Sequence, residues 1–193
     1  AMTLCLWSRV ASRVLEELAH RRCRSADELY DLVRTVNWSK MIGPDQTLAV
    51  RATLRTPHFN HSTFAAQRVK DGVVDHVRDA TGQRPSVDLE DPDLPLKLVI
   101  RGEHATLARD LAGQSLHKRG YRPIQVKSPI NEALAAGLIL LTGWDGKQAL
   151  CDPMCGSGTF LIEAAHIAAD RAPGLRREFA FQRWPDFDRR TWK

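Results

Sequence analysis

The part of this sequence best suited to chemistry is a glycine-containing run, Asp152-Pro-Met-Cys-Gly156-Ser-Gly158-Thr159, which follows a short apolar segment. Glycines at a strand-to-helix turn let the backbone approach a ligand closely, and the N-terminus of the following helix offers N–H groups that lack partners inside the helix. Turns of this kind bind phosphates, dinucleotides or S-adenosylmethionine (SAM), or bind nothing and serve only to reverse the chain.

The spacing of the residues separates these ligands. A phosphate loop requires GxxxxGK followed by Ser or Thr, but no Lys follows Gly158. A dinucleotide site requires GxGxxG, and its third glycine position is Leu161 here. The remaining ligand is SAM, which an acidic residue at the end of the first strand, Asp152, would orient while Gly156 and Gly158 leave room. Taken alone, the Gly-x-Gly pattern could also be a tight turn that binds no ligand.

A second candidate site is the basic segment that precedes this turn by about thirty residues. Its basic side chains could pair with nucleic-acid phosphates, and its tyrosine could stack on a base. The same residues could equally form a solvated surface strip with a packed tyrosine. The residues concerned are Lys118, Arg119, Tyr121, Arg122 and Lys127.

Hydrophobic periodicity and turn residues predict the elements that position these groups. Before the basic segment the expected order is α-α-β-α-β-β: helices over 7–18, from the capping box at 25–28 and over 63–80, and strands over 48–54, 96–100 and 105–110. After it we expect a helix over 132–141, a strand over 148–152 and a helix over 159–170. Strand, glycine turn and helix are the opening of a doubly wound sheet.

Composition excludes several classes of protein. The chain has 193 residues, of which 43% are hydrophobic and 26% charged, as in ordinary globular domains. No apolar run approaches the roughly 20 residues that span a bilayer, so no membrane contact is expected. The four cysteines form neither CxxC nor zinc spacing, which indicates free thiols in a reducing cytoplasm and no metal site.

The charge is unevenly distributed along the chain. The formal net charge is +5, with 20 Lys and Arg against 15 Asp and Glu up to residue 130, and 8 against 8 afterwards. An excess confined to the first two thirds indicates a polyanionic partner there.

The run over 152–165, DPMCGSGTFLIEAA, resembles the signature of THUMP-domain RNA methyltransferases. Other segments are similar to the bacterial large-subunit ribosomal RNA guanine-N2 methyltransferases within that family. These segments are 7–15, 25–30, 69–75, 82–88, 115–122 and 129–135.

The resemblance implies an α+β THUMP-like module over 1–113, a basic linker over 114–130, and the beginning of an α/β Rossmann-like SAM-dependent methyltransferase domain over 131–193. It implies a cytoplasmic enzyme that methylates a guanine N2 of 23S ribosomal RNA, with the THUMP-like module binding the RNA. An N6-adenine DNA methylase remains an alternative, as does a nucleic-acid-binding module without catalysis.

The resemblance also assigns site residues. The implied SAM-binding residues are Asp152, Pro153, Cys155, Gly156, Ser157, Gly158 and Thr159, with Asn131 and Glu132 near them; the implied RNA-binding residues are Lys118, Arg119, Tyr121, Arg122 and Lys127. Cys155 is expected to be a small packing residue, because amino methylation needs no enzyme nucleophile. The motif that holds the amine of a flipped base contains Pro-Pro, which the sequence lacks. The chain is therefore expected to be a fragment that transfers no methyl group by itself, and its catalytic residues stay unassigned.

Overall fold

A computed structural model describes residues 1–121, 129–190 and 192. The chain divides into two compact units, one made of residues 1–14 and 114–178 and the other of residues 15–113 and 179–193. The sequence predicts three contiguous segments instead, a THUMP-like module over 1–113, a linker over 114–130 and a methyltransferase domain over 131–193. These domain boundaries stay a prediction.

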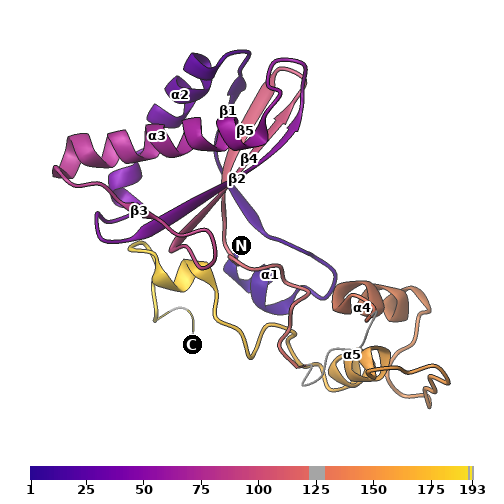
Figure 1. Ribbon diagram of the computed structural model, residues 1–193. Helices are drawn as coiled ribbons and strands as arrows, with labels where there is room; N and C mark the ends of the chain where they lie inside the picture. Colours follow the sequence, from indigo (N-terminus) through magenta and orange to yellow (C-terminus); the bar gives the residue numbers. More distant parts are fainter. Residues whose placement is uncertain (122–128, 191, 193) are drawn as a thin grey trace. The chain divides into compact units, whose positions relative to one another are not determined.

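The second unit is built on a five-stranded sheet with the order β1-β5-β4-β2-β3 (Figure 1). Its strands are β1 (Leu15–Arg22), β2 (Thr47–Arg55), β3 (Ser86–Val87), β4 (Leu94–Arg101) and β5 (His104–Asp110). β5 pairs antiparallel with β1 and β4, whereas β2 pairs parallel with β4 and β3. Alternate residues of the central strands, among them Leu48, Leu98 and Leu107, are fully buried and form the core.

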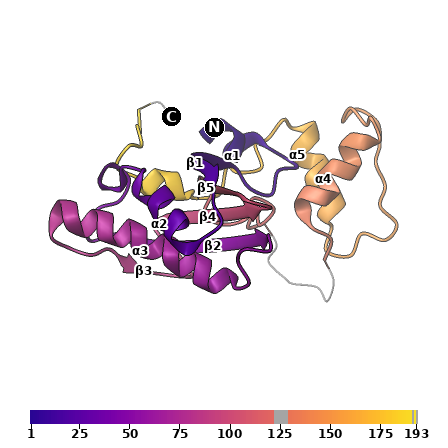
Figure 2. The ribbon, with the colours of Figure 1, turned by 90° about the horizontal axis from the view of Figure 1, so that it is seen from above.

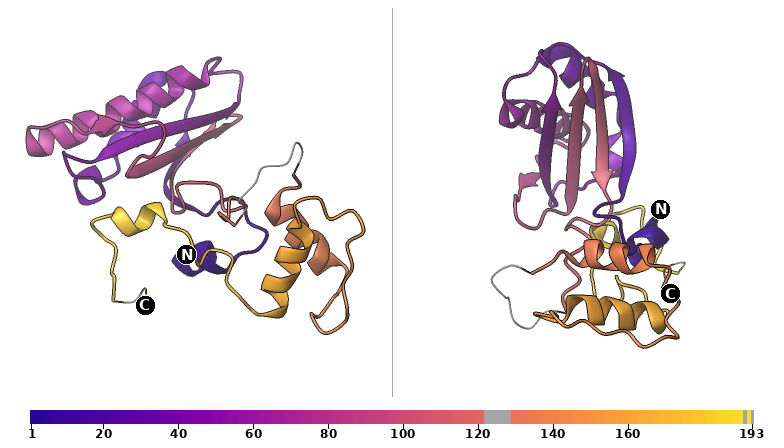
Figure 3. Two further views of the ribbon diagram at one scale, coloured as in Figure 1. Left: turned by 60° about the horizontal axis from the view of Figure 1, so that its bottom comes forward. Right: turned by 90° about the vertical axis from the view of Figure 1, so that its right-hand side faces the viewer.

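Two helices, α2 (Ala26–Arg34) and α3 (Ser62–Thr81), lie on one face of this sheet (Figure 3). The expected N-cap is confirmed, because the Ser25 side chain accepts the Glu28 N–H at 3.2 Å at the start of α2. The Glu28 carboxylate accepts the Arg24 N–H at 2.7 Å instead of the Ser25 N–H, so the reciprocal bond of the expected capping box is replaced. α3 buries Val69, Val73 and Val77 and ends at a left-handed Gly82, as its sequence predicts. Two short 3-10 helices, η1 (Trp38–Lys40) and η2 (Ala180–Arg183), complete the unit.

The other unit is helical in its described part. It contains α1 (Met2–Trp7), α4 (Glu132–Leu141) and α5 (Thr159–Ala168), and α4 and α5 pack against each other (Figure 2). Small side chains such as Ala135, Ala136 and Ala164 are buried in this unit and allow the helices to approach closely. No helix among the described residues is both long and apolar enough to cross a bilayer.

Two expected elements are wrong. The helix expected over 7–18 is replaced by the short α1, which ends at Trp7, and by β1, which begins at Leu15 and pairs with β5. The strand expected over 148–152 does not form, because no described strand lies beside it to satisfy its backbone groups.

Candidate functional site

The glycine turn lies directly before α5 and has the backbone that its sequence predicts. Gly156 and Gly158 have φ of +52° and +74°, in the left-handed region that side chains disfavour. A Cβ on either residue would meet no atom within 4 Å, so open space lies beside both. Gly158 is the N-cap of α5, and its N–H donates to the Cys155 carbonyl at 2.7 Å. The turn therefore presents bare backbone and a helix N-terminus to a ligand.

Asp152 adds an unmatched carboxylate oxygen to this turn. Its Oδ1 accepts the Met154 N–H at 3.1 Å, which fixes the side chain. Its Oδ2 is buried and accepts no hydrogen bond from any described residue. A buried acceptor without a donor is costly, so a ligand that brings a donor fits here. The ammonium group in the methionine part of SAM is such a donor.

The other implied cofactor residues differ in accessibility. Ser157 Oγ and Thr159 Oγ1 lie 3.3 Å apart, and Thr159 is buried at the start of α5. Pro153 is exposed. Cys155 is also exposed, which corrects the expectation that it is a packing residue.

The remaining implied cofactor residues, Asn131 and Glu132, begin α4. The Asn131 side chain caps the helix by accepting the Leu134 N–H at 3.1 Å. Glu132 is buried in the first turn, where the helix dipole favours a negative charge. The role of both residues toward SAM stays a prediction.

A buried polar cluster centres on Glu163 of α5. One carboxylate oxygen of Glu163 accepts a hydrogen bond from Arg119 Nη1, and the other accepts the Tyr121 hydroxyl at 2.7 Å. The Arg119 and Glu163 side chains are 1% and 0% exposed. A second guanidinium nitrogen of Arg119 donates to the Arg9 carbonyl. The cluster thus ties the segment before residue 122 and the chain near Arg9 to α5.

Burial dominates the titration of this cluster. It raises the pKa of the Glu163 carboxyl, while the Tyr121 hydrogen bond and the Arg119 charge oppose that rise. Burial and the hydrogen bond to Glu163 raise the pKa of Tyr121, which therefore stays protonated and donates. Arg119 keeps its charge, since a guanidinium remains protonated in proteins even where burial lowers its pKa.

This geometry corrects the interpretation of the basic segment. Arg119 is buried and Tyr121 is half-buried, and both bind Glu163, so neither belongs to an exposed basic strip on the surface. Lys118 is exposed, as the interpretation requires, while Arg122 and Lys127 lie outside the described residues. A signal for the buried pair is present in the sequence: Glu163 is an acidic residue inside an otherwise apolar helix and needs an internal cation.

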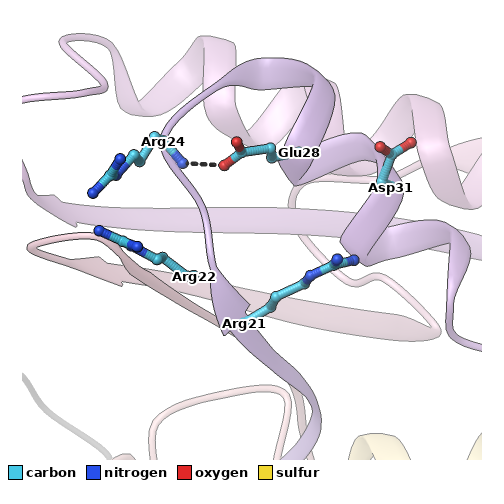
Figure 4. Close-up of a pocket in the computed structure, with 5 residues that line it drawn as sticks. All are labelled: Arg21, Arg22, Arg24, Glu28 and Asp31. Carbon is cyan, nitrogen blue, oxygen red and sulfur yellow. Dashed lines mark hydrogen bonds between the residues drawn. The ribbon is translucent and has the colours of Figure 1, made fainter.

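The sheet unit carries a basic cavity that the sequence interpretation missed. It has a volume of about 300 Å³ and is lined by Arg21, Arg22, Arg24, Glu28 and Asp31 (Figure 4). The guanidinium groups of Arg22 and Arg24 both bind Glu103, at 2.6 Å and 2.8 Å. Three arginines within four positions of the sequence are the signal for this cavity.

A basic row crosses the face of the sheet opposite α2 and α3. The strand register places Arg55 beside Arg101, Arg101 beside His104, and His104 beside Arg22. All four side chains are exposed. A parallel pair of cations, Arg51 and Lys97, lies four residues from the first two. We call the residues Arg22, Arg51, Arg55, Lys97, Arg101 and His104 the basic row. Basic side chains aligned across neighbouring strands, roughly 4.8 Å apart, suit a polyanion.

Comparison with known families identifies the class of protein. The THUMP domain family matches residues 23–110, and the family described as RMKL-like, methyltransferase domain, matches residues 119–193. The chain thus combines a THUMP domain with an RMKL-like methyltransferase domain. The expected fold class, an α+β THUMP module followed by an α/β Rossmann-like methyltransferase domain, is confirmed.

Particular relatives support this class. The ribosomal RNA large subunit methyltransferase K/L of Syntrophotalea carbinolica is 50% identical, over 100% of this chain and 28% of that protein. The protein of the same name from a Marinomonas species is 44% identical, over 98% of this chain and 27% of its own length. The chain therefore spans about a quarter of the length of these two relatives.

Two solved structures share the fold. One is a predicted N6-adenine-specific DNA methylase of Listeria monocytogenes, with a TM-score of 0.88 and 31% identity, over 99% of this chain and 50% of that one. The other is SMU.472 in complex with SAH, with a TM-score of 0.85 and 29% identity, over 98% of this chain and 50% of that one. SAH is the product that SAM leaves after methyl transfer, so SAM is the cofactor of this methyltransferase class.

Proposed function

We propose that this chain is part of an enzyme that transfers a methyl group from SAM to guanine N2 in large-subunit ribosomal RNA. The observation that carries the proposal is the glycine turn, where a buried, unmatched Asp152 oxygen lies next to two open left-handed glycines. The names of the K/L relatives support ribosomal RNA as the substrate. A protein that methylates ribosomal RNA would act in the cytoplasm.

Bound SAM supplies an activated methyl group on a sulfonium. The chain's own residues would bind and orient the cofactor: Asp152 Oδ2 would accept a hydrogen bond from its ammonium group, and Gly156 and Gly158 would let its methionine part approach the backbone. The attacking nitrogen belongs to the RNA base, and holding both groups in line lowers the barrier without an enzyme nucleophile. Because the sequence contains no Pro-Pro motif, the group that holds the base amine is not assigned to this chain.

The basic row is the proposed RNA-binding surface of the THUMP unit. Its side chains come from four neighbouring strands, so the sheet holds them in a fixed array that can follow phosphates. The basic cavity at Arg21, Arg22 and Arg24 adjoins this array, since Arg22 belongs to both. Lys118 stays in the proposal as an exposed cation, but Arg119 and Tyr121 do not.

Calorimetry of SAM binding tests the cofactor site. Asp152→Asn in the 193-residue chain should weaken SAM binding by at least about tenfold, because the amide no longer attracts the ammonium group. Asp145→Asn is the matched control, since Asp145 is exposed and pairs only with Lys147 among the described residues. Equal affinities for wild type and Asp152→Asn would remove Asp152 from the cofactor site.

The target base is tested in a full-length protein that contains this segment. After incubation with unmodified 23S ribosomal RNA and labelled SAM, nuclease digestion and mass spectrometry should yield N2-methylguanosine. The same protein with DNA tests the second candidate, N6-adenine methylation, which the name of the Listeria structure favours. N6-methyladenine in DNA, without methylated guanine in RNA, would replace our proposal by that one.

A further inference from the structure

A cavity at the C-terminal half of α5 lies apart from the residues of the glycine turn. It has a volume of about 210 Å³. Its polar lining consists of three arginines, one histidine and one tyrosine: Arg119, Arg171, Arg176, His166 and Tyr121. No acidic residue of the described chain lines it. The volume holds a phosphate group with room for water or an attached sugar.

Buried nitrogen atoms without partners lie in the cavity lining and near it. Arg119 lines it with a side chain that is 1% exposed, and its Nε donates no hydrogen bond to any described residue. His166 Nδ1 is likewise buried and unpartnered. Arg9 holds the His166 carbonyl through Nη2 at 3.2 Å, and its own Nη1 is a third buried nitrogen without a partner. Arg119 Nε and His166 Nδ1 belong to residues that line the cavity, whereas Arg9 lies outside the lining. The buried Arg119 N–H without an acceptor favours an acceptor-rich ligand.

The charges around the cavity favour an anion. Four arginines, Arg9, Arg119, Arg171 and Arg176, add their positive charges to the effect of burial in lowering the pKa of His166. Opposing them are the two buried carboxyls Glu163 and Glu132, which act on Arg119, and the exposed Asp170, which lies 3.9 Å from Arg9.

Two of these arginines are uncommitted. Arg171 and Arg176 are exposed, and neither makes an ion pair with a described residue. Their guanidinium groups are therefore available to a ligand, whereas those of Arg9 and Arg119 are already partly bound within the protein.

We propose that this cavity binds a phosphate group through Arg119, Arg171 and Arg176, independently of the SAM site. A guanidinium matches two phosphate oxygens with parallel hydrogen bonds, and a tetrahedral oxyanion offers enough acceptors for several arginines at once. The buried Arg119 supplies a fixed donor, because Glu163 and the Arg9 carbonyl hold it. The exposed arginines close on the ligand from the solvent side. A free phosphate ion and a phosphodiester of RNA share this chemistry.

Titration of the 193-residue chain with inorganic phosphate at constant ionic strength tests the site. Nuclear magnetic resonance should detect a saturable change in the His166 ring signals and in the Arg119 Nε–H signal. Arg171→Gln together with Arg176→Gln should weaken phosphate binding by at least about tenfold. The matched control replaces Arg189 and Arg190 by Gln, two exposed residues that do not line the cavity.

Two results would overturn the proposal: a linear, unsaturated response at His166, or equal weakening in the control variant. A short RNA oligonucleotide then identifies the source of the phosphate. Competition of the oligonucleotide with inorganic phosphate for the His166 signal supports an RNA phosphodiester as ligand, and absence of competition supports a free ion. SAM affinity should be the same in all these variants, so failure of the phosphate site is distinct from failure of the cofactor site.

Discussion

Glu163 and Arg119 form an ion pair whose cost and benefit are both large. Each loses hydration on burial, and each is stabilised by the other and by the hydrogen bonds from Tyr121 and to the Arg9 carbonyl. If one charge is removed, the desolvation cost of the other is no longer offset, and the folded state is destabilised by that amount. Removing one partner of the pair is therefore strongly destabilising, whereas replacing both partners by apolar residues costs little.

Glu163→Gln should lower the free energy of unfolding by about 3–5 kcal/mol, because it leaves the Arg119 charge buried without a counter-charge. Urea denaturation followed by circular dichroism measures this loss. The control is Glu178→Gln, a substitution at an exposed carboxyl. The double variant Arg119→Met with Glu163→Leu should recover most of the loss, and a loss below about 1 kcal/mol in Glu163→Gln would show that the pair is hydrated in solution.

His166 makes stability depend on pH in a definite direction. Burial and the neighbouring arginines lower its pKa from the ordinary value of 6.5, so the unfolded chain binds this proton more readily than the folded one. Stability should therefore be highest above pH 6.5 and fall as the pH drops below it. His166→Gln should flatten the fall in unfolding free energy between about pH 7 and 5. Burial also lowers the pKa of His76, so His76 contributes a fall in stability in the same direction, and this part remains in the His166→Gln variant. Identical pH profiles of the wild type and the variant would contradict the role of His166.

Gly158 is the position where backbone geometry and ligand binding meet. With φ at +74° and no atom near an added Cβ, Gly158→Val is strained by its backbone angle and clashes only with a ligand. We expect Gly158→Val to abolish SAM binding in calorimetry and to leave RNA binding largely intact. Asn tolerates the left-handed region, so Gly158→Asn separates the two effects: it should keep the fold and still weaken SAM binding. Unchanged affinity in both variants would reject the turn as the cofactor site.

Among the helices and strands, those whose ends are set by neighbouring residues can be predicted from the sequence. The Ser25 cap and the terminal Gly82 define α2 and α3 because both signals act within a few residues. The turn at Gly102 likewise joins β4 to β5 as expected. These elements need no knowledge of distant partners.

The failures concern elements that depend on distant partners. β1 is an edge strand, mostly exposed and interrupted by a bulge between Glu17 and Ala19, so its sequence shows no clean alternation. The apolar residues before and within it happen to follow helical spacing, but pairing with β5 decides the conformation. The segment over 148–152 shows the reverse case, an apolar run without a described strand to pair with.

The crossing of α2 and α3 depends on the absence of a side chain at Gly72. A Cβ there would lie 2.8 Å from Val33 Cγ1 and 3.0 Å from Val33 Cβ. Alanine usually stabilises a helix by about 1 kcal/mol over glycine, but overpacking costs about 1–3 kcal/mol. Gly72→Ala should therefore lower the melting temperature. Adding Val33→Ala should raise it again, and a stabilised Gly72→Ala single variant would contradict the close crossing.

For the whole molecule, the sequence shows which part of the chain carries the excess positive charge, but it does not show how the folded chain arranges that charge on its surface. The excess before residue 131 predicts a polyanion partner, and the sheet arranges much of that charge as the basic row, whose members are separated along the chain. The residues of the SAM turn are predictable because they are contiguous. Arg119 is misinterpreted because its partner Glu163 is forty-four positions away. Variants of Arg119 are unsuited to a test of RNA binding, because loss of the Arg119 charge leaves Glu163 buried without a counter-charge and destabilises the unit.

The basic row predicts how RNA binding responds to salt. Each arginine that pairs with a phosphate releases counterions, so the logarithm of affinity falls with the logarithm of salt concentration by roughly 0.7–0.9 per contact. Replacing Arg51, Arg55 and Arg101 by Gln should weaken binding of a structured ribosomal RNA fragment and reduce that slope by about two to three units. The control replaces Arg84, Arg189 and Arg190, which are exposed and lie outside the row. Because the row is exposed, the melting temperature should change little, so a loss of binding is not a loss of fold. A slope that is equal in the two triple variants would mean that RNA meets the molecule through general positive charge rather than through this face of the sheet.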